Sequence, residues 1–433
     1  MINLENLTIK KAHDSLMRAE FSVGELAQAY LDVIVKKNTE MNAYLEVFDD
    51  VLQQASHADE MIKNGSATLL TGIPFAVKDN ILIKGRTASA ASKMLENYTA
   101  TYDASVIAKL KECGAVFLGR TNMDEFAMGG STENSAFGPT KNPHDTSRVP
   151  GGSSGGSAAA VSMGGALAAL GSDTGGSIRQ PASLCGVVGL KPTYGSVSRH
   201  GLMAMGSSLD QIGPFGKTVE DVRAIFNVIK GADSMDSTSV PLHLRGKEET
   251  IKKKMVIGVP EDFLTMEGID VDVLQNFRET LSKLEGKGHV IKKVTLPNLK
   301  YSLASYYIIM PAEASTNLAR FDGVRYGLSI KGDTLFGDYA KTRGNGFGKE
   351  TRRRIMLGAY VLSAGYYDAY YNKATAVRAL IQKDFNEAFS GVDVIATPTS
   401  PTPAFKIGEK ASDPLAMYLA DIFTVPINLA GVP

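Results

Sequence analysis

The chain has 433 residues, enough to bury a large core, and its 44% hydrophobic and 21% charged content is ordinary for a globular enzyme. The 46 basic residues balance 46 acidic ones, so net charge gives no sign of attraction to nucleic acid or membranes. No apolar run reaches the length of a membrane span, the start lacks a signal-peptide pattern, and Cys113 and Cys185 lack metal-ligand spacing. We therefore expect a cytoplasmic protein without membrane contact or a metal site.

The first part of the chain, residues 1–65, predicts helices. Ser22 and Glu25 form a capping-box pattern at the start of one of them, and apolar residues follow at helical spacing. We expect this segment to pack on a main domain that spans residues 66–433.

The main domain begins with predicted strands. Residues 73–77 are an apolar run bounded by turn signals, which favours a buried strand, and residues 115–118 favour another. Lys78 ends the first run, and from the residues alone a lysine in this place is expected to be exposed. Asp124 and Glu125 follow the second strand. Because adjacent residues on a helix point in different directions, we do not expect these two carboxylates to share a site.

Two loops rich in glycine and serine, residues 151–157 and 173–181, flank a segment of small and apolar residues. Glycine costs backbone entropy, so this density indicates that backbone N–H groups approach another group closely. A flexible linker is the alternative, but the run continues directly into alanines and leucines that favour burial. We expect a buried catalytic loop, a helix over residues 154–164 and a strand over residues 166–171.

Three other site types overlap this stretch. Residues 151–155 satisfy G-x-S-x-G, the nucleophile elbow of α/β-hydrolases, but residues 142–150 do not favour the strand that this motif needs, and no histidine follows His289. A Cys-His glutaminase would use Cys185, whose apolar neighbours instead predict a small buried side chain. A nucleotide-binding loop would need G-K-[ST] after the glycines, which is missing.

The rest of the chain alternates between predicted strands and helices. Residues 187–190 favour a strand and residues 220–229 a helix. Residues 255–259 and 290–296 favour strands on either side of a helix, which makes a β-α-β unit within an α/β sheet. Residues 392–396 favour a further strand.

The two loops resemble the amidase signature. Gly-Gly-Ser-Ser-Gly-Gly-Ser begins at Gly151, Asp-Thr-Gly-Gly-Ser-Ile-Arg-Gln-Pro-Ala begins at Asp173, and the match extends upstream to Gly-Ile-Pro-Phe-Ala-Val-Lys-Asp-Asn at residues 72–80. The resemblance implies an α/β protein of the amidase-signature fold, with a mixed β-sheet covered by helices on both faces. Family members continue beyond the last motif, so the chain is expected to be incomplete at its C-terminal end.

The resemblance implies a Ser-Ser-Lys triad. Ser177 would be the nucleophile, Ser153 the bridging hydroxyl in a cis peptide, and Lys78 the base, which reverses the expectation of an exposed lysine. A serine hydroxyl needs a neighbouring base, and a lysine can act as one where burial leaves it neutral. Asp210 would either support the site or form a turn. Backbone N–H groups of four consecutive residues would form the oxyanion hole: Thr174, Gly175, Gly176 and Ser177.

Within the family, the chain resembles the glutaminase subunits of tRNA-dependent amidotransferases. This resemblance implies that Arg354 grips the α-carboxylate of glutamine, a bidentate task suited to a guanidinium, and that Asp421 pairs with the α-ammonium. Met128 and Gly129 would line the substrate pocket. From the residues alone, Arg354 belongs to a run of three arginines typical of a solvated helix face, and Asp421 is equally a helix cap.

The implied activity is release of ammonia from glutamine. The ammonia would pass to a partner B subunit, which uses ATP and Mg to amidate Glu-tRNA(Gln), and a small C subunit would complete a heterotrimer. No cofactor is expected in this chain. The first alternative is a stand-alone amidase that acts on small aryl or aliphatic amides. The second is a non-catalytic scaffold protein, against which the intact triad argues.

Overall fold

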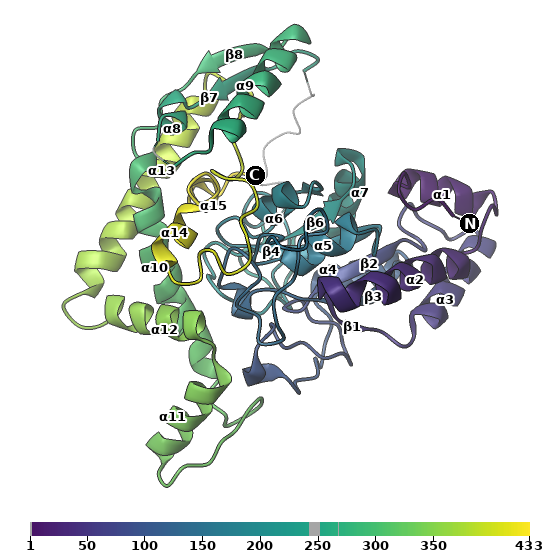
Figure 1. The fold of residues 1–433 in the computed structure, drawn as a ribbon, viewed down its shortest axis with the longest axis horizontal. Helices are drawn as coiled ribbons and strands as arrows, with labels where there is room; N and C mark the ends of the chain where they lie inside the picture. The colour runs from purple at the N-terminus through teal and green to yellow at the C-terminus, as the bar shows by residue number, and fades with distance from the viewer. Residues whose placement is uncertain (1, 242–251, 267) are drawn as a thin grey trace.

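The computed structural model describes residues 2–241, 252–266 and 268–433 (Figure 1). Its centre is a six-stranded mixed sheet with the strand order β1-β3-β2-β4-β6-β5. In this sheet β2 is parallel to β3 and β4, whereas β1, β5 and β6 make antiparallel pairs. The strands are β1 (Tyr44–Val47), β2 (Pro74–Lys78), β3 (Val116–Thr121), β4 (Ala168–Asp173), β5 (Val188–Gly189) and β6 (Gln211–Gly216). The α/β class and the mixed sheet flanked by helices agree with the sequence prediction.

Helices of the first half of the chain flank this sheet (Figure 1). The capping box at Ser22 and Glu25 is present at the start of α2, as the sequence predicts. The α-helices are α1 (Ile9–Met17), α2 (Val23–Met41), α3 (Val51–Lys63), α4 (Ser105–Glu112), α5 (Gly155–Ser162), α6 (Arg179–Leu184) and α7 (Val219–Ile229), and two short 3₁₀ helices are η1 (Lys93–Leu95) and η2 (Glu125–Ala127).

The N-terminal segment contains a β-strand in addition to the predicted helices. Helix α2 ends at Asn42, which has a left-handed backbone with φ of 51°, and the chain then turns into β1. Strand β1 pairs with β3 at the edge of the central sheet, and side chains of α1, α2 and α3 belong to the same buried cluster as the sheet. A four-residue strand carries too short a hydrophobic pattern for the sequence to predict it.

A second, three-stranded parallel sheet lies apart from the first, with the order β8-β7-β9 (Figure 1). It contains the predicted β-α-β unit, formed by β7 (Val256–Val259), α9 (Val271–Gly286) and β8 (Val290–Lys293), together with β9 (Val394–Ile395). The sequence predicted this unit as part of one common sheet. Strand β8 is largely exposed and ends in Lys292 and Lys293, which are unsuited to the buried centre of the larger sheet.

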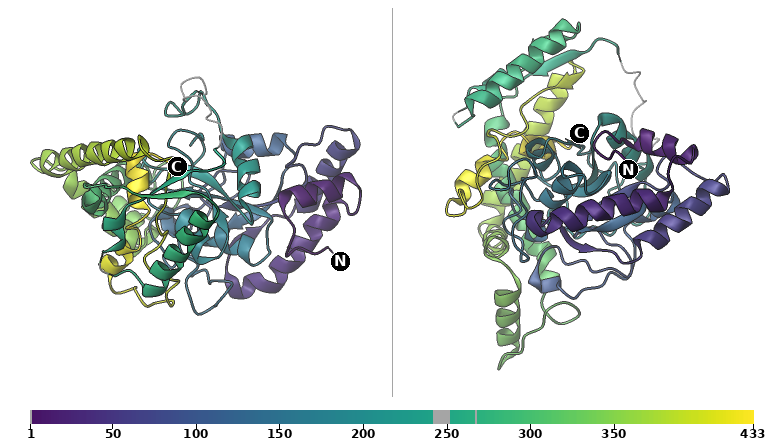
Figure 2. Two further views of the ribbon diagram at one scale, coloured as in Figure 1. Left: turned by 90° about the horizontal axis from the view of Figure 1, so that it is seen from above. Right: turned by 45° about the vertical axis from the view of Figure 1, so that its right-hand side comes forward.

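The second half of the chain is mainly helical and packs beside the central sheet (Figure 2). Helix α10 contacts α12, α13 and α15, and these helices surround a second buried cluster. Within the described residues, no helix combines the length and apolar character needed to span a bilayer. The helices are α8 (Glu261–Leu264), α10 (Ser302–Asn317), α11 (Leu335–Gly346), α12 (Lys349–Val361), α13 (Lys373–Phe389), α14 (Pro414–Leu419) and α15 (Val425–Ala430), with the short 3₁₀ helices η4 (Leu299–Tyr301) and η5 (Leu318–Arg320) and the π-helix η6 (Asp368–Asn372).

Candidate active site

Lys78 lies at the end of β2, a central strand, and its side chain is completely buried. Its Nζ is 2.8 Å from Ser153 Oγ, 2.7 Å from Ser154 Oγ and 2.9 Å from Ser172 Oγ. The expectation of an exposed lysine, drawn from the residues alone, is therefore wrong. The lysine stays in the interior because β3 pairs with β2 as far as Lys78, and β4 on the other side continues beyond its pairing with β2.

The surroundings of Lys78 favour its neutral form. Burial lowers the pKa of Lys78 to about 7, although the nearby carboxylates of Asp124, Asp173 and Asp210 act in the opposite direction. A lysine with this pKa is largely unprotonated just above neutral pH. It can then accept a proton from a hydroxyl group, which an ordinary surface lysine cannot do.

The bridging serine and the nucleophile come from separate loops that meet. Ser153 follows a cis peptide bond after Gly152, and the Gly152 N–H donates to the Gln180 side chain at 2.9 Å. The Ser154 N–H donates to the Ser177 carbonyl at 3.2 Å, which places Ser153 beside Ser177 although 24 positions separate them. In the described residues 122–150 no strand leads into Ser153, so the α/β-hydrolase elbow is excluded.

Cys185, the candidate for a Cys-His glutaminase, is a buried thiol. It is fully enclosed, and its Sγ lies 3.3 Å from the Pro150 carbonyl. Burial raises the pKa of the Cys185 thiol far above its usual range, so the reactive thiolate is not formed at neutral pH. Within the parts of the chain that the structure describes, no group of three His, Cys, Asp or Glu residues is placed to hold a metal ion.

Asp173 organises the loop that carries the nucleophile. Its carboxylate accepts from the backbone N–H groups of Gly176 at 2.9 Å and Ile178 at 3.0 Å, and from Arg179 Nη2 at 3.0 Å. Burial alone would raise the pKa of Asp173, but the Arg179 guanidinium and these hydrogen bonds hold it well below its usual range. Asn428 Nδ2 adds a further bond at 2.9 Å. Asp173 and Arg179 both belong to the signature motif, but the sequence did not predict this role for them.

The predicted oxyanion donors differ in their surroundings. Gly176 was predicted to be an oxyanion donor, but its N–H donates to the Asp173 carboxylate and is not available to an oxyanion. The N–H groups of Thr174, Gly175 and Ser177 have no acceptor among the described residues. They are therefore the groups that remain to face an oxyanion.

Asp210 contacts this loop directly. It is buried and accepts from Thr174 Oγ1 at 2.6 Å and from the N–H groups of Met205 and Gly206. Of the two roles that the sequence left open, Asp210 therefore combines both, because it closes a tight turn and supports the loop of the nucleophile.

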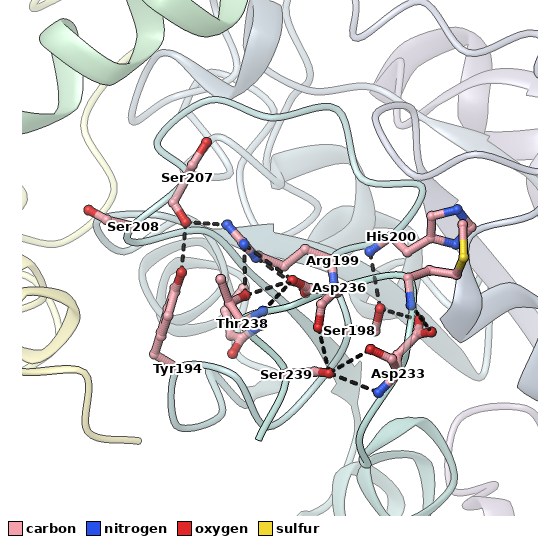
Figure 3. A network of polar contacts seen from close by, with 12 residues as sticks. Tyr194, Ser198, Arg199, His200, Ser207, Ser208, Asp233, Asp236, Thr238 and Ser239 are labelled. Carbon is pink, nitrogen blue, oxygen red and sulfur yellow. Dashed lines mark hydrogen bonds and ion pairs between the residues drawn. The ribbon is translucent and has the colours of Figure 1, made fainter. Parts of the chain in front are cut away.

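A polar network holds the segment before Asp210 (Figure 3). The Ser207 carbonyl accepts from Tyr194 Oη at 2.8 Å and from Arg199, whose guanidinium also pairs with Asp236. The sequence did not reveal this network, because its members are scattered along more than 40 residues.

Arg354 lies inside the protein, on α12, and not on a solvated helix face. Its guanidinium lies 4.8 Å from the ring centre of Tyr307 and 4.6 Å from that of Tyr418, and its Nε donates to Glu350 at 2.6 Å. Tyr418 Oη also donates to Glu350, at 2.8 Å. The rings of Tyr307 and Tyr418 stack on each other with their centres 4.1 Å apart, and the guanidinium lies against this pair while Glu350 holds its Nε. A guanidinium fixed in this way can bind a carboxylate partner.

Asp421 joins the same cluster through Tyr307, whose hydroxyl donates to Asp421 Oδ2 at 2.8 Å. Burial raises the pKa of Asp421 to about 7, against the effects of Tyr307 and of the Arg354 charge. The cap of α14 is Asp413, not Asp421. The structure therefore brings Arg354 and Asp421 together, with Tyr307 in contact with both. Sequence reasoning missed Tyr307, Tyr418 and Glu350, although the aromatic residues of α10 were a visible signal.

Met128 and Gly129 lie at the end of η2, and Gly129 packs against Asp124, which contacts the triad. A Cβ on Gly129 would lie 2.3 Å from Asp124 Cγ, so only glycine fits there. The Asp124 N–H donates to the Ser153 carbonyl at 3.1 Å. Its neighbour Glu125 instead accepts from side chains and backbone of other elements, so the two carboxylates do not share a site, as predicted.

Comparison of the sequence with known proteins shows which protein family has this site. The family model described as Amidase matches residues 25–433. The chain is 54% identical to the A subunit of glutamyl-tRNA(Gln) amidotransferase from Thermoanaerobacter pseudethanolicus, over 100% of this chain and 89% of that protein. It is 53% identical to the protein of the same name from Carboxydothermus hydrogenoformans, over 100% and 90% of the two chains.

Solved structures that superpose on this chain come from the same kinds of protein. The crystal structure of the A subunit of glutamyl-tRNA(Gln) amidotransferase from Thermotoga maritima superposes with a TM-score of 0.80, at 46% identity, over 100% of this chain and 87% of that one. A crystal structure named simply as an amidase superposes with a TM-score of 0.81, at 29% identity, over 98% and 90% of the two chains. The signature loops, the buried lysine and these matches lead to one conclusion: the chain belongs to the amidase family.

Proposed function

We propose that this chain is the glutaminase component of a tRNA-dependent amidotransferase. It hydrolyses glutamine through Lys78, Ser153 and Ser177 and supplies the ammonia that converts Glu-tRNA(Gln) to Gln-tRNA(Gln). The observation that carries this proposal is the cluster in which Arg354 and Asp421 both contact Tyr307. A fixed guanidinium and a carboxylate side by side match the α-carboxylate and α-ammonium of a free amino acid.

The first chemical step forms an acyl-enzyme. Ser177 Oγ attacks the side-chain carbonyl carbon of glutamine while its proton passes to Ser153 Oγ and the Ser153 proton passes to neutral Lys78. The carbonyl oxygen becomes an oxyanion that the free backbone N–H groups of the loop stabilise. The C–N bond then breaks, and the leaving nitrogen takes a proton back through Ser153 and departs as ammonia.

The second step reverses the relay. A water molecule attacks the acyl carbon, and its proton passes through Ser153 to Lys78. The bond from the acyl carbon to Ser177 Oγ breaks, the serine regains its proton, and glutamate leaves. Lys78 is neutral before each attack and protonated after it, and its lowered pKa makes both states accessible near neutral pH.

In this proposal, the released ammonia is used by another subunit of the complex. The relatives are named as A subunits of glutamyl-tRNA(Gln) amidotransferases, which supports an assembly of several subunits. In this proposal a B subunit binds Glu-tRNA(Gln), ATP and Mg, a C subunit completes the heterotrimer, and the complex acts in the cytoplasm. This chain itself contributes glutamine binding and hydrolysis and carries no cofactor.

The test is ammonia release from glutamine by this chain co-purified with its partner subunits. Release should disappear in Ser177→Ala and in Lys78→Met, and it should persist in Ser56→Ala, which changes an exposed serine of α3. Butyramide serves as a simple amide without the α-carboxylate and α-ammonium. Turnover of butyramide with none of glutamine would contradict the proposal and favour a general amidase.

A further inference from the structure

Thr424 lies where the segment of Asp421 meets the loop of the nucleophile. Its side chain is buried, and its Oγ1 is 2.6 Å from the Gly175 carbonyl oxygen and 3.2 Å from the Asp421 carbonyl oxygen. Its own carbonyl accepts from Arg179 Nη1 at 3.1 Å. One threonine thus contacts the backbone on both sides of the site, although about 250 residues separate Gly175 from Thr424.

These contacts fix a single peptide group of the nucleophile loop. Thr424 binds the C=O of the Gly175–Gly176 peptide, and Asp173 accepts from its N–H at 2.9 Å. A peptide group is planar, so holding both ends fixes its orientation and that of the residues next to it. A Cβ on Gly176 would lie 2.4 Å from Thr424 Oγ1, so the approach is as close as glycine permits. The free N–H groups of Gly175 and Ser177 lie on either side of this peptide.

Thr424 also shares a tight turn with Asp421. The N–H groups of Thr424 and Val425 donate to the Asp421 carbonyl at 3.1 and 3.0 Å. A ligand that holds the Asp421 side chain therefore restrains the same turn that presents the Thr424 hydroxyl. The turn therefore links Asp421, where the α-ammonium would bind, directly to the loop that would stabilise the oxyanion.

We propose that Thr424 is a positioning residue that couples recognition of the substrate α-ammonium at Asp421 to the geometry of the oxyanion loop. This inference rests on the proposed function, because it concerns glutamine hydrolysis at the same site. It assigns part of the preference for a free amino acid to the rate of the chemical step and not to binding alone. An amide without an α-ammonium would leave the turn unrestrained and would react more slowly once bound.

The test compares Thr424→Val, which keeps the shape and removes the hydroxyl, with Thr424→Ser, which keeps the hydroxyl, in the assembled complex. We expect kcat for glutamine to fall about 10- to 100-fold in Thr424→Val, because small displacements of catalytic groups have effects of this size. KM should change by less than about threefold, and Thr424→Ser should restore kcat. The matched control is Thr342→Val on α11, a buried threonine bonded to the backbone of Ile330, which should leave kcat unchanged.

A double-mutant cycle tests the coupling itself. In the Asp421→Asn background, Thr424→Val should lower kcat by less than about threefold, because the connection is already broken. Butyramide turnover should likewise change by less than about threefold in Thr424→Val. Equal loss in both Thr424 variants, or full additivity with Asp421→Asn, would overturn the inference. If the wild-type complex hydrolyses glutamine and kcat of Thr424→Val equals that of the wild type, only the inference about Thr424 is overturned. A wild type that cleaves butyramide alone overturns the proposed function as well.

Discussion

Lys78 Nζ lies 2.8 Å from Ser153 Oγ in a site where both side chains are fully excluded from solvent. The same nitrogen contacts the hydroxyls of Ser154 and Ser172 and the Ser172 carbonyl, so four polar groups share one buried amine. An amine in such a setting is surrounded mainly by hydroxyls, which bind either protonation state. Its charge is therefore controlled mainly by burial and by carboxylates farther away, which makes the site sensitive to pH.

The first prediction concerns that sensitivity. Because burial lowers the pKa of Lys78 to about 7 and the base must be neutral, kcat/KM for butyramide should rise as pH increases towards 7 and level off above it. Below the pKa the rate should fall about tenfold per pH unit. Butyramide is the right substrate, because it does not depend on the ionisation of Asp421. A profile that stays flat from about pH 5 to 9 would exclude Lys78 as the base.

The second prediction is that Arg354→Lys raises KM for glutamine by about 10- to 100-fold, the effect of losing a hydrogen bond between charged groups. Lysine can neither bind a carboxylate with two parallel bonds nor place a planar group against the rings of Tyr307 and Tyr418. Steady-state kinetics with glutamine measure the effect, and butyramide is the control substrate because it has no carboxylate. An equal loss with both substrates would indicate a general disturbance of α12 in place of lost recognition.

The third prediction concerns Asp421, whose pKa burial raises to about 7. Only the ionised carboxylate attracts an ammonium, so KM for glutamine should increase as pH falls below about 7. In Asp421→Asn, KM should be about tenfold higher at about pH 8, as expected for a lost charge-assisted bond, and should no longer vary with pH in this range. Retention of the wild-type pH dependence of KM in this variant would place the ammonium elsewhere.

The fourth prediction is a large loss of stability in Asp173→Asn. This change leaves the mostly buried charge of Arg179 without its carboxylate partner, which typically costs about 3–5 kcal/mol of the free energy of unfolding. Chemical denaturation measures it. Asp14→Asn, which removes an exposed partner of Lys10 on α1, is the control and should leave the unfolding midpoint close to the wild-type value.

The lowered pKa of Asp173 also predicts how its contribution to stability depends on pH. The pKa of Asp173 is depressed in the folded protein, so its contribution to stability is complete above the unfolded value of about 3.9 and is lost as pH falls through the folded value. The difference in unfolding free energy between wild type and Asp173→Asn should therefore stay constant from neutral pH down to about 4 and shrink only in stronger acid.

Much of the fold follows from local patterns. The capping box of α2, the buried strand before Lys78 and the β-α-β unit of α9 were each predictable, because their signals lie within one short stretch. Strand β1 was not predictable, because four residues give no clear period. The separation of the β-α-β unit into its own sheet depends on long-range packing, which a local pattern does not encode.

The candidate site divides in the same way. The motifs identify the signature residues, and the structure then reverses the simplest interpretation of Lys78 as an exposed side chain. The cluster of Tyr307, Glu350 and Tyr418 around Arg354 could not be found from spacing, because its members come from three helices far apart in the chain. The engagement of Gly176 by Asp173 is equally invisible in a glycine-rich motif, whose N–H groups all look alike.

The dependence of the nucleophile loop on Thr424 and Asn428 has a consequence for synthesis of the protein. Lys78, Ser153 and Ser177 leave the ribosome early, yet the bonds to Gly175, Asp173 and Arg179 form only when residues 424–428 have been made. A growing chain therefore holds all three triad residues without the loop that they require. The bonds that hold the Gly175–Gly176 peptide and the Arg179 side chain from this late segment are therefore among the last in the site that synthesis makes possible.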